Sequence, residues 1–183
     1  FCKAIIATKN LHLEQWYNRS KISPENGLDG VDFCNDLMQL KPADLYIIAV
    51  SDSAVEVISN ALPFEKRLVV HTSGSVALRF LNKKNRKGVF YPLQTFSKTS
   101  NLDFVNVPIC IETTDKSDRK LLKSVAEALG SPTYFIQSEQ RQSLHLSAVF
   151  VNNFTNQLYR IAHELTDREG IEFFLTATIL TNK

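Results

Sequence analysis

The sequence predicts an α/β fold in which a doubly wound, mostly parallel sheet is followed by a region of helices only. Two short apolar runs, residues 45–50 (LYIIAV) and 67–70 (RLVV), end abruptly in small polar residues. Such runs are typical of strands buried on both faces, as in a parallel sheet covered by helices. In these sheets ligands bind outside the carboxyl ends of the strands. We therefore expect a small-molecule site at residues 49–52 and 71–74.

The strands and helices alternate up to about residue 137. Apolar runs between polar turns predict strands at residues 13–17, 45–51, 68–71, 88–91, 107–112 and 133–136. Residues 1–10 have the pattern of the end of a helix, and further helices are predicted at residues 53–62, 76–81 and 118–129. Pro63 ends the helix at 53–62, while Asp115 or Ser117 caps the helix at 118–129 and Gly130 ends it.

From about residue 138 the pattern changes to helices only: a long helix to Thr166, a break at 167–170 and a second helical stretch. This change predicts a sheet domain at residues 1–137 and a helical domain at residues 138–183.

The chain starts inside a helix, although a doubly wound sheet begins with a strand and a glycine-rich turn. Residues 21–41 are also too short for a complete crossover connection. We therefore expect the natural polypeptide to contain further residues, upstream and in this region, and the helical domain to be incomplete.

Composition excludes several classes of function. A net charge of +2 over 183 residues is too small to indicate a nucleic-acid surface. Cys2, Cys34 and Cys110 lack the spacing of metal ligands and are typical of reduced thiols in a cytoplasmic protein. The chain has no membrane-spanning run and no signal-peptide pattern. A serine-hydrolase function is disfavoured because HTSGS (residues 71–75) lacks the GxSxG pattern.

Three polar residues, Asn18, Arg19 and Ser20, follow the strand at 13–17. At this point in dinucleotide-binding folds, an acidic residue binds the ribose hydroxyls of NAD, whereas an arginine accommodates the 2′-phosphate of NADP. Here no carboxylate is present, and a guanidinium matches a phosphate in charge and shape. We therefore favour NADP over the alternative of a solvated arginine in a polar turn.

The ends of the next two strands supply the other candidates for cofactor binding. These are Ala49, Val50, Ser51 and Asp52 after one strand, and Thr72, Ser73 and Gly74 after the other. The first group would pass beneath the ribose and pyrophosphate, and the second would line the nicotinamide or substrate end. Gly74 permits close backbone approach or a positive φ. Asp52 could instead cap the helix that follows it. His71 is either a proton donor or a hydrogen-bonded structural residue.

Polar residues also recur along the long helix. His145, Asn152, Asn156 and His163 are spaced by seven, four and seven residues, which places them on one helical stripe. Asn153 lies one position off this stripe and competes with Asn152 for the inward place. The stripe would present imidazole and amide groups to a substrate in a cleft, or it would form the solvated side of an amphipathic helix.

Four segments in this order carry a family resemblance: ADLYIIAVSDSAVEVI, VVHTSGSV, VFYPLQTFSK and LHLSAVFVNNFTNQLY. The chain resembles the Rossmann-like DUF2520 proteins, which are often labelled NADP oxidoreductases. That family is similar to pyrroline-5-carboxylate reductase and to deazaflavin-dependent NADP reductases. The resemblance implies an NAD(P)-binding domain at residues 1–137. It also implies a helical domain at 138–183 like that of 6-phosphogluconate dehydrogenase, which commonly dimerises.

The resemblance also implies roles for single residues. Asn18, Arg19 and Ser20 would meet the adenosine phosphate; Ser51, Asp52, His71, Ser73 and Gly74 would line the cleft; His145 and Asn153 would face it from the helical domain. The family's glycine-rich phosphate loop has no counterpart here, because the chain starts after it. Tyr91 stands where many relatives carry a histidine, which excludes a histidine-based mechanism at that position.

These observations lead to one functional hypothesis and an alternative. The hypothesis is an NADP-dependent oxidoreductase that transfers hydride between the nicotinamide and a small carbonyl or imine substrate. The candidate catalytic residues are His145, Asn153 and His71, and no metal is expected. We expect a cytoplasmic homodimer, formed through the helical domain, with no nucleic-acid or membrane partner. The alternative is a non-catalytic dinucleotide-binding sensor or dimeric scaffold.

Overall fold

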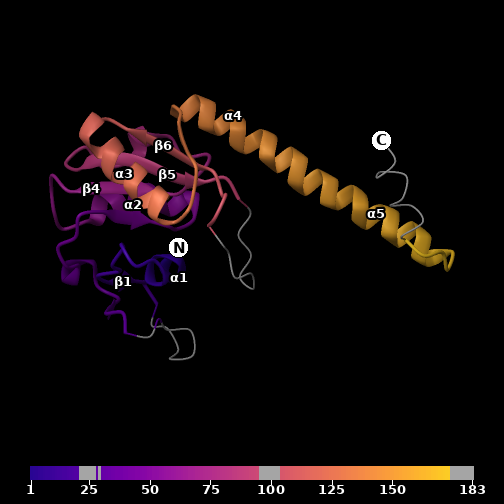
Figure 1. Ribbon diagram of the computed structural model, residues 1–183, viewed down its shortest axis with the longest axis horizontal. Coiled ribbons are helices and arrows are strands. Elements are labelled where there is room, and N and C mark those ends of the chain that lie inside the picture. The colour runs from indigo at the N-terminus through magenta and orange to yellow at the C-terminus, as the bar shows by residue number, and fades with distance from the viewer. Residues whose placement is uncertain (21–27, 29, 95–103, 174–183) are drawn as a thin grey trace. The chain divides into compact units, whose positions relative to one another are not determined.

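The computed structural model describes residues 1–20, 28, 30–94 and 104–173 (Figure 1). The chain divides into two compact units, Phe1–Gln142 and Ser143–Lys183. This division lies inside a long helix, a few residues after position 137, where the sequence pattern changes. The helical stretch expected after Gly170 lies mostly outside the described residues.

A five-stranded sheet with the strand order β3-β4-β5-β6-β7 forms the centre of the first unit (Figure 1). Its strands are β3 (Tyr46–Ile48), β4 (Leu68–His71), β5 (Arg86–Pro92), β6 (Ile109–Thr113) and β7 (Thr133–Phe135). The pairs β3–β4, β4–β5 and β6–β7 are parallel, and only β5–β6 is antiparallel among these strands. The predicted α/β class with a mostly parallel sheet is therefore confirmed.

A separate two-stranded sheet precedes it in the chain. Strand β1 (Trp16–Tyr17) pairs in parallel with β2 (Phe33–Cys34), with Trp16 opposite Phe33. Backbone bonds from Trp16 to Asp32 and from Asn18 to Cys34 extend this pairing at both ends. The sequence pattern does not indicate β2, because two residues are too few to show a strand pattern.

Three helices of the first unit match the predicted positions within a few residues. They are α1 (Cys2–Ala7), α2 (Asp52–Ala61) and α3 (Lys116–Ala128). Of the two predicted caps of α3, Asp115 is the one used, and its carboxylate accepts a hydrogen bond from the Ser117 amide at 2.8 Å. Gly130 follows α3 with φ +77°, a conformation that glycine adopts without strain. The part of the chain that the structure describes also contains the 3₁₀ helices η2 (Leu37–Gln39) and η3 (Leu78–Phe80), the latter in place of the helix predicted at 76–81.

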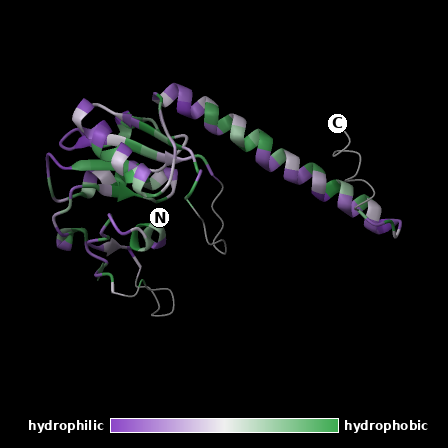
Figure 2. Cartoon of the chain, in the orientation of Figure 1, coloured by the Kyte–Doolittle hydropathy of each residue, from purple (hydrophilic) through white to green (hydrophobic). Residues whose placement is uncertain are grey.

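Alternate side chains of each strand pack on opposite faces of the sheet, as a period of two requires. One face, covered by α3 with α1 packed against the same core, contains Leu68, Val70, Phe90, Ile109 and Ile111. The other face contains Ile48 and Val69, which pack against Val55 of α2. The strong hydrophobic colour of the strands in Figure 2 reflects this burial on both faces.

The second unit continues the helix that begins in the first. Helix α4 (Ser138–Val149) passes through a π-helical turn, η4 (Phe150–Phe154), into α5 (Thr155–Arg168). The predicted long helix at 138–166 is thus present but interrupted by the wider turn. Large apolar side chains are exposed along it, namely Leu146, Phe150, Val151, Phe154, Leu158, Ile161 and Leu165. Within the described ranges, no helix combines the length and the apolar character needed to cross a membrane.

Candidate functional site

The ends of β3 and β4 lie side by side at one edge of the sheet. The two strands are parallel, with Ile48 opposite His71, and the Thr72 amide donates to the Ile48 carbonyl at 3.2 Å. Residues 49–52 and 72–75 therefore leave the sheet together, and we call them the strand-end shelf. The structure brings seven of the predicted cofactor-binding residues to this shelf: Ala49, Val50, Ser51, Asp52, Thr72, Ser73 and Gly74.

A side-chain hydrogen bond joins the two halves of the shelf. Asp52 is the first residue of α2, and its carboxylate accepts a hydrogen bond from the Ser75 hydroxyl. The alternative in which Asp52 caps α2 is wrong, because Ser51 occupies the cap position and makes no capping bond with its side chain. Residues 49–52 are exposed, so this half of the shelf is open to a ligand.

The second half of the shelf is folded around Ser73. Its buried hydroxyl accepts hydrogen bonds from the amides of Ser75, at 3.1 Å, and Val76, at 3.0 Å. Gly74 is buried and is not among the described glycines with positive φ, so a positive φ is not the reason for a glycine here. The Ser73 hydroxyl is therefore committed to holding the turn.

His71 is fully buried beneath this turn. Its Nδ1 accepts a hydrogen bond from the Ser73 amide at 3.2 Å, and its Nε2 has no partner among the described residues. Burial, with the nearby Arg141 charge, lowers the pKa of His71 to about 4. The imidazole is neutral at pH 7, and its burial favours the structural alternative for this residue over the role of proton donor.

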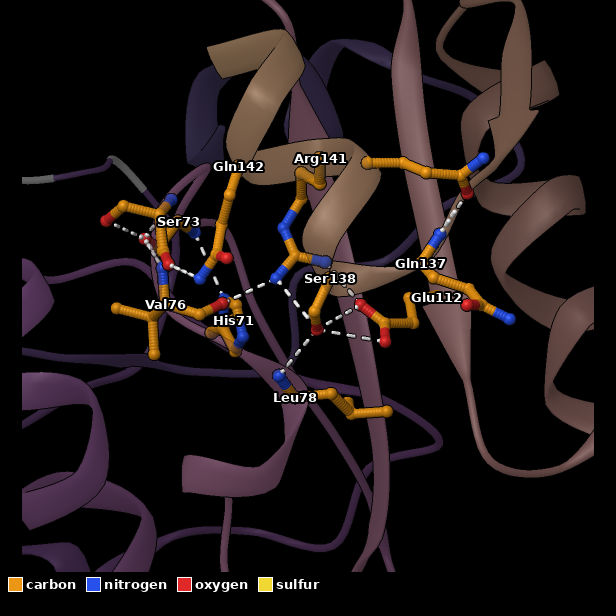
Figure 3. A network of polar contacts seen from close by, with 11 residues as sticks. His71, Ser73, Val76, Leu78, Glu112, Gln137, Ser138, Arg141 and Gln142 are labelled. Carbon is orange, nitrogen blue, oxygen red and sulfur yellow. Dashed lines mark hydrogen bonds and ion pairs between the residues drawn. The ribbon is translucent and has the colours of Figure 1, made fainter. Parts of the chain in front are cut away.

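A charged network that was not predicted from the sequence lies on the face of the sheet that carries His71 (Figure 3). Arg141, in α4, is fully buried, pairs with Glu112 of β6 and also donates to the Val76 carbonyl. The Ser138 hydroxyl donates to Glu112 at 2.9 Å and accepts from the Leu78 amide at 3.1 Å. The first turn of α4 is thus bonded both to β6 and to the chain that leaves β4.

One signal in the sequence could have revealed this network. Glu112 is the only charged residue in the otherwise apolar predicted strand at 107–112. A carboxylate on a strand that is buried on both faces requires a cation. The spacing of Ser138 and Arg141 by three residues places both on one side of a helix, where each can reach that carboxylate.

Asn18, Arg19 and Ser20 lie at the end of β1, in the two-stranded sheet. The Asn18 amide nitrogen Nδ2 donates to the Ser20 carbonyl at 2.9 Å and holds the turn in shape. Arg19 is exposed and makes no hydrogen bond or ion pair with any described residue, so its guanidinium is available to a ligand. No hydrogen bond between described residues joins these three residues to the strand-end shelf.

The remaining candidates lie in the second unit, at and around the π-helical turn. Asn156 donates to Asn152 at 3.3 Å, and Asn152 donates to Asn153 at 3.3 Å, so the three amides form one chain. His145 is half-buried, whereas His163 is exposed and pairs with Asp167 at 2.9 Å. Because π-helical turns are frequent at functional sites, the position of η4 adds interest to Asn152 and Asn153. The described residues contain no cluster of His, Cys, Asp or Glu suited to a metal ion.

Residues 107–182 match a family model described as a domain of unknown function, DUF2520. A search of curated proteins finds no match. A solved structure from Bacteroides fragilis, named as a "putative NADP oxidoreductase", is 34% identical. The alignment covers 98% of this chain and 74% of that one, with a TM-score of 0.77. The chain belongs to the DUF2520 family.

Two more distant structures share the fold of this DUF2520 chain. Protein TM1727 from Thermotoga maritima is 20% identical over 83% of this chain and 60% of its own, with a TM-score of 0.66. A pyrroline carboxylate reductase from Plasmodium falciparum, solved with NADP bound, is 10% identical over 97% of this chain and 68% of its own, also with a TM-score of 0.66. At these identities the similarity shows the Rossmann-type fold alone.

Proposed function

We propose that this DUF2520 protein is an NADP-dependent oxidoreductase that transfers hydride between the nicotinamide and a small carbonyl or imine substrate. The observation that carries the proposal is the strand-end shelf, where parallel strands β3 and β4 open onto exposed polar residues. Ligands bind at this edge in doubly wound sheets. The Bacteroides fragilis relative, 34% identical and named for NADP chemistry, supports the same assignment.

The described residues fit NADP in two places. Arg19, exposed and unpaired among the described residues, suits the 2′-phosphate, because its fork of donors matches phosphate oxygens. The exposed residues 49–52 offer a surface for the ribose and pyrophosphate. The bound nicotinamide would supply or accept the hydride. The protein's own residues then have to bind the dinucleotide, orient the substrate and deliver a proton.

We assign the orienting and proton-delivering roles to His145 and Asn153 of the helical unit. Asn153 lies in the π-helical turn and is exposed, and its side chain is joined to Asn152. An imidazole and an amide are suited to a carbonyl or imine group. The imidazole can give a proton, and the amide N–H can donate a hydrogen bond to the carbonyl oxygen or imine nitrogen. His71, the third candidate, supports the Ser73 turn from beneath and acts as a positioning residue.

The alternative of a non-catalytic dinucleotide-binding sensor is supported by one observation. Asp52 is the single titratable residue on the strand-end shelf, so the shelf itself has no acid–base pair. The two functions are separated by mixing the full-length protein with NADPH and a panel of carbonyl and imine compounds. Loss of NADPH absorbance with any member supports the oxidoreductase, whereas binding without turnover across the panel supports the sensor.

The proposed choice of cofactor gives the first prediction. Calorimetry of the full-length protein should show tighter binding of NADPH than of NADH, and Arg19→Ala should weaken NADPH binding roughly 10- to 100-fold, as expected for lost charge-assisted hydrogen bonds. NADH affinity should stay unchanged. Arg67→Ala is the matched control, since Arg67 is an exposed arginine at the other end of β4. Equal affinity for both cofactors, unaltered in Arg19→Ala, would contradict the phosphate assignment.

We also propose that the protein is a homodimer formed through its helical unit. Exposed apolar side chains recur along α4, η4 and α5, and Figure 2 shows hydrophobic and hydrophilic colours alternating along these helices. Large exposed apolar surfaces of this kind are typical of protein interfaces.

The three cysteines are free among the described residues, which supports a cytoplasmic location.

The dimer gives a second prediction, which sedimentation velocity can test. Leu158 is exposed by 67% in the apolar row, so Leu158→Lys should place a charge in the interface and raise the dimer dissociation constant at least about tenfold. Gln157→Lys is the control, because Gln157 bonds to Arg160 in the polar row beside Glu164. A wild-type monomer at micromolar concentration, or equal effects of both variants, would argue against this interface.

A further inference from the structure

The chain that leaves β4 is held by three side chains of one helical turn. We call residues 73–78 the β4 exit segment. Ser138 accepts from the Leu78 amide at 3.1 Å, Arg141 donates to the Val76 carbonyl, and Gln142 donates to the Ser75 carbonyl at 2.6 Å (Figure 3). The three bonds reach successive parts of the exit segment, and all come from the first turns of α4.

The helical turn that makes these bonds is itself fixed to the sheet. Arg141 is fully buried and pairs with Glu112 of β6, whose side chain is 15% exposed. Ser138 donates to the same carboxylate. Moving the turn would leave a nearly buried carboxylate and a buried guanidinium without partners, which is strongly unfavourable. The start of α4 is thus a rigid support and not a loose neighbour.

The other side of the exit segment belongs to the strand-end shelf. The Ser75 hydroxyl donates a hydrogen bond to Asp52, and the Ser73 hydroxyl accepts hydrogen bonds from the amides of Ser75 and Val76. Ser75 therefore bonds to α4 through its carbonyl and to α2 through its hydroxyl. A displacement of the start of α4 would be transmitted directly to the part of the shelf assigned to the nicotinamide end.

We propose that the first turns of α4 set the position of the β4 exit segment and thereby the place of the nicotinamide, with Arg141 and Gln142 as positioning residues. This inference rests on the proposed function for its second half only. Its first half, that α4 holds the exit segment in shape, stands on the hydrogen bonds alone.

Amide hydrogen exchange tests the first half in the full-length protein. The amides of Ser75, Val76 and Leu78 are all bonded to side chains and report opening of the exit segment. Gln142→Ala and the charge-conserving Arg141→Lys should each speed their exchange roughly 2- to 10-fold, as expected when one hydrogen bond is lost. Gln140→Ala is the matched control, because among the described residues the Gln140 side chain bonds only to the Gln137 amide of its own turn. Unchanged exchange in both variants would overturn the inference.

The fluorescence of bound NADPH tests the second half. In Gln142→Ala the emission of the bound nicotinamide should change, while the dissociation constant for NADPH stays within about twofold, because Arg19 is intact. If Gln142→Ala showed faster amide exchange but the same NADPH emission spectrum as wild type, the proposal that α4 sets the place of the nicotinamide would be overturned. If wild-type protein does not bind NADPH at all, the proposed function fails and this part fails with it. The exchange result would still decide whether α4 holds the exit segment.

Discussion

Replacing Arg141 with methionine is expected to lower the free energy of unfolding by about 3–5 kcal/mol, the usual cost of breaking a buried ion pair by removing one partner. The variant keeps most of the side-chain volume but leaves Glu112, which is 15% exposed, without its cation. The Val76 carbonyl also loses its donor. Urea unfolding followed by circular dichroism measures the loss.

Two further variants separate charge from packing in this experiment. Adding Glu112→Gln to Arg141→Met removes the unpaired carboxylate and should recover part of the lost stability. Arg160→Met is the matched control, because Arg160 is exposed and pairs with Glu164 within one helix, where such a pair contributes about 0.5 kcal/mol or less. If Arg141→Met lowered the free energy of unfolding by no more than Arg160→Met does, the buried network would contribute little to folding.

Acid is expected to destabilise the fold through His71. The folded-state pKa is about 4, against 6.5 for the free side chain, so the unfolded chain binds the extra proton between these values. The contribution of His71 to the free energy of unfolding is fully present above pH 6.5 and is lost as the pH falls from 6.5 through 4. From the shift of the pKa, this contribution is about 3 kcal/mol. Urea unfolding at pH 7, 5.5 and 4.5 measures the slope.

A variant without the imidazole isolates the contribution of His71 to this slope. His71→Gln should be less stable at pH 7, because the Ser73 amide loses its acceptor, but its stability should fall less steeply between pH 6.5 and 4. His12→Gln is the control for replacing a histidine by glutamine, since the His12 side chain is 83% exposed. Equal slopes in wild type and His71→Gln would show that another group governs acid unfolding.

The sequence was sufficient to predict the central strands, because their burial is a local property. The run at Leu68–His71 is apolar, short and followed by small polar residues, and it forms β4 with these bounds. The shelf followed from the same pattern, since parallel strands end at one edge. Strand β2 was missed because its two residues owe their strand conformation to β1, many positions away.

Glu112 on its apolar strand signals that a cation is needed, but local pattern does not identify Arg141 as that cation. In the sequence Arg141 is one polar residue in a polar stretch, and its burial depends on Glu112, which lies 29 positions earlier. Long-range pairing of charges leaves no periodic signal in the chain. The roles of Arg19, His145 and Asn153 depend on a ligand, and local pattern in the sequence does not contain that ligand.

The π-helical turn at Phe150–Phe154 has a consequence for the evolution of this helix. A turn of this kind arises when one extra residue is accommodated within an α-helix. Deleting one residue there would restore ordinary winding and leave the sides of α5 facing nearly as before, whereas a deletion elsewhere in the helix would rotate everything that follows by about 100°. The π-helical turn is therefore the place in this helix where the loss of one residue would disturb the facing of α5 least.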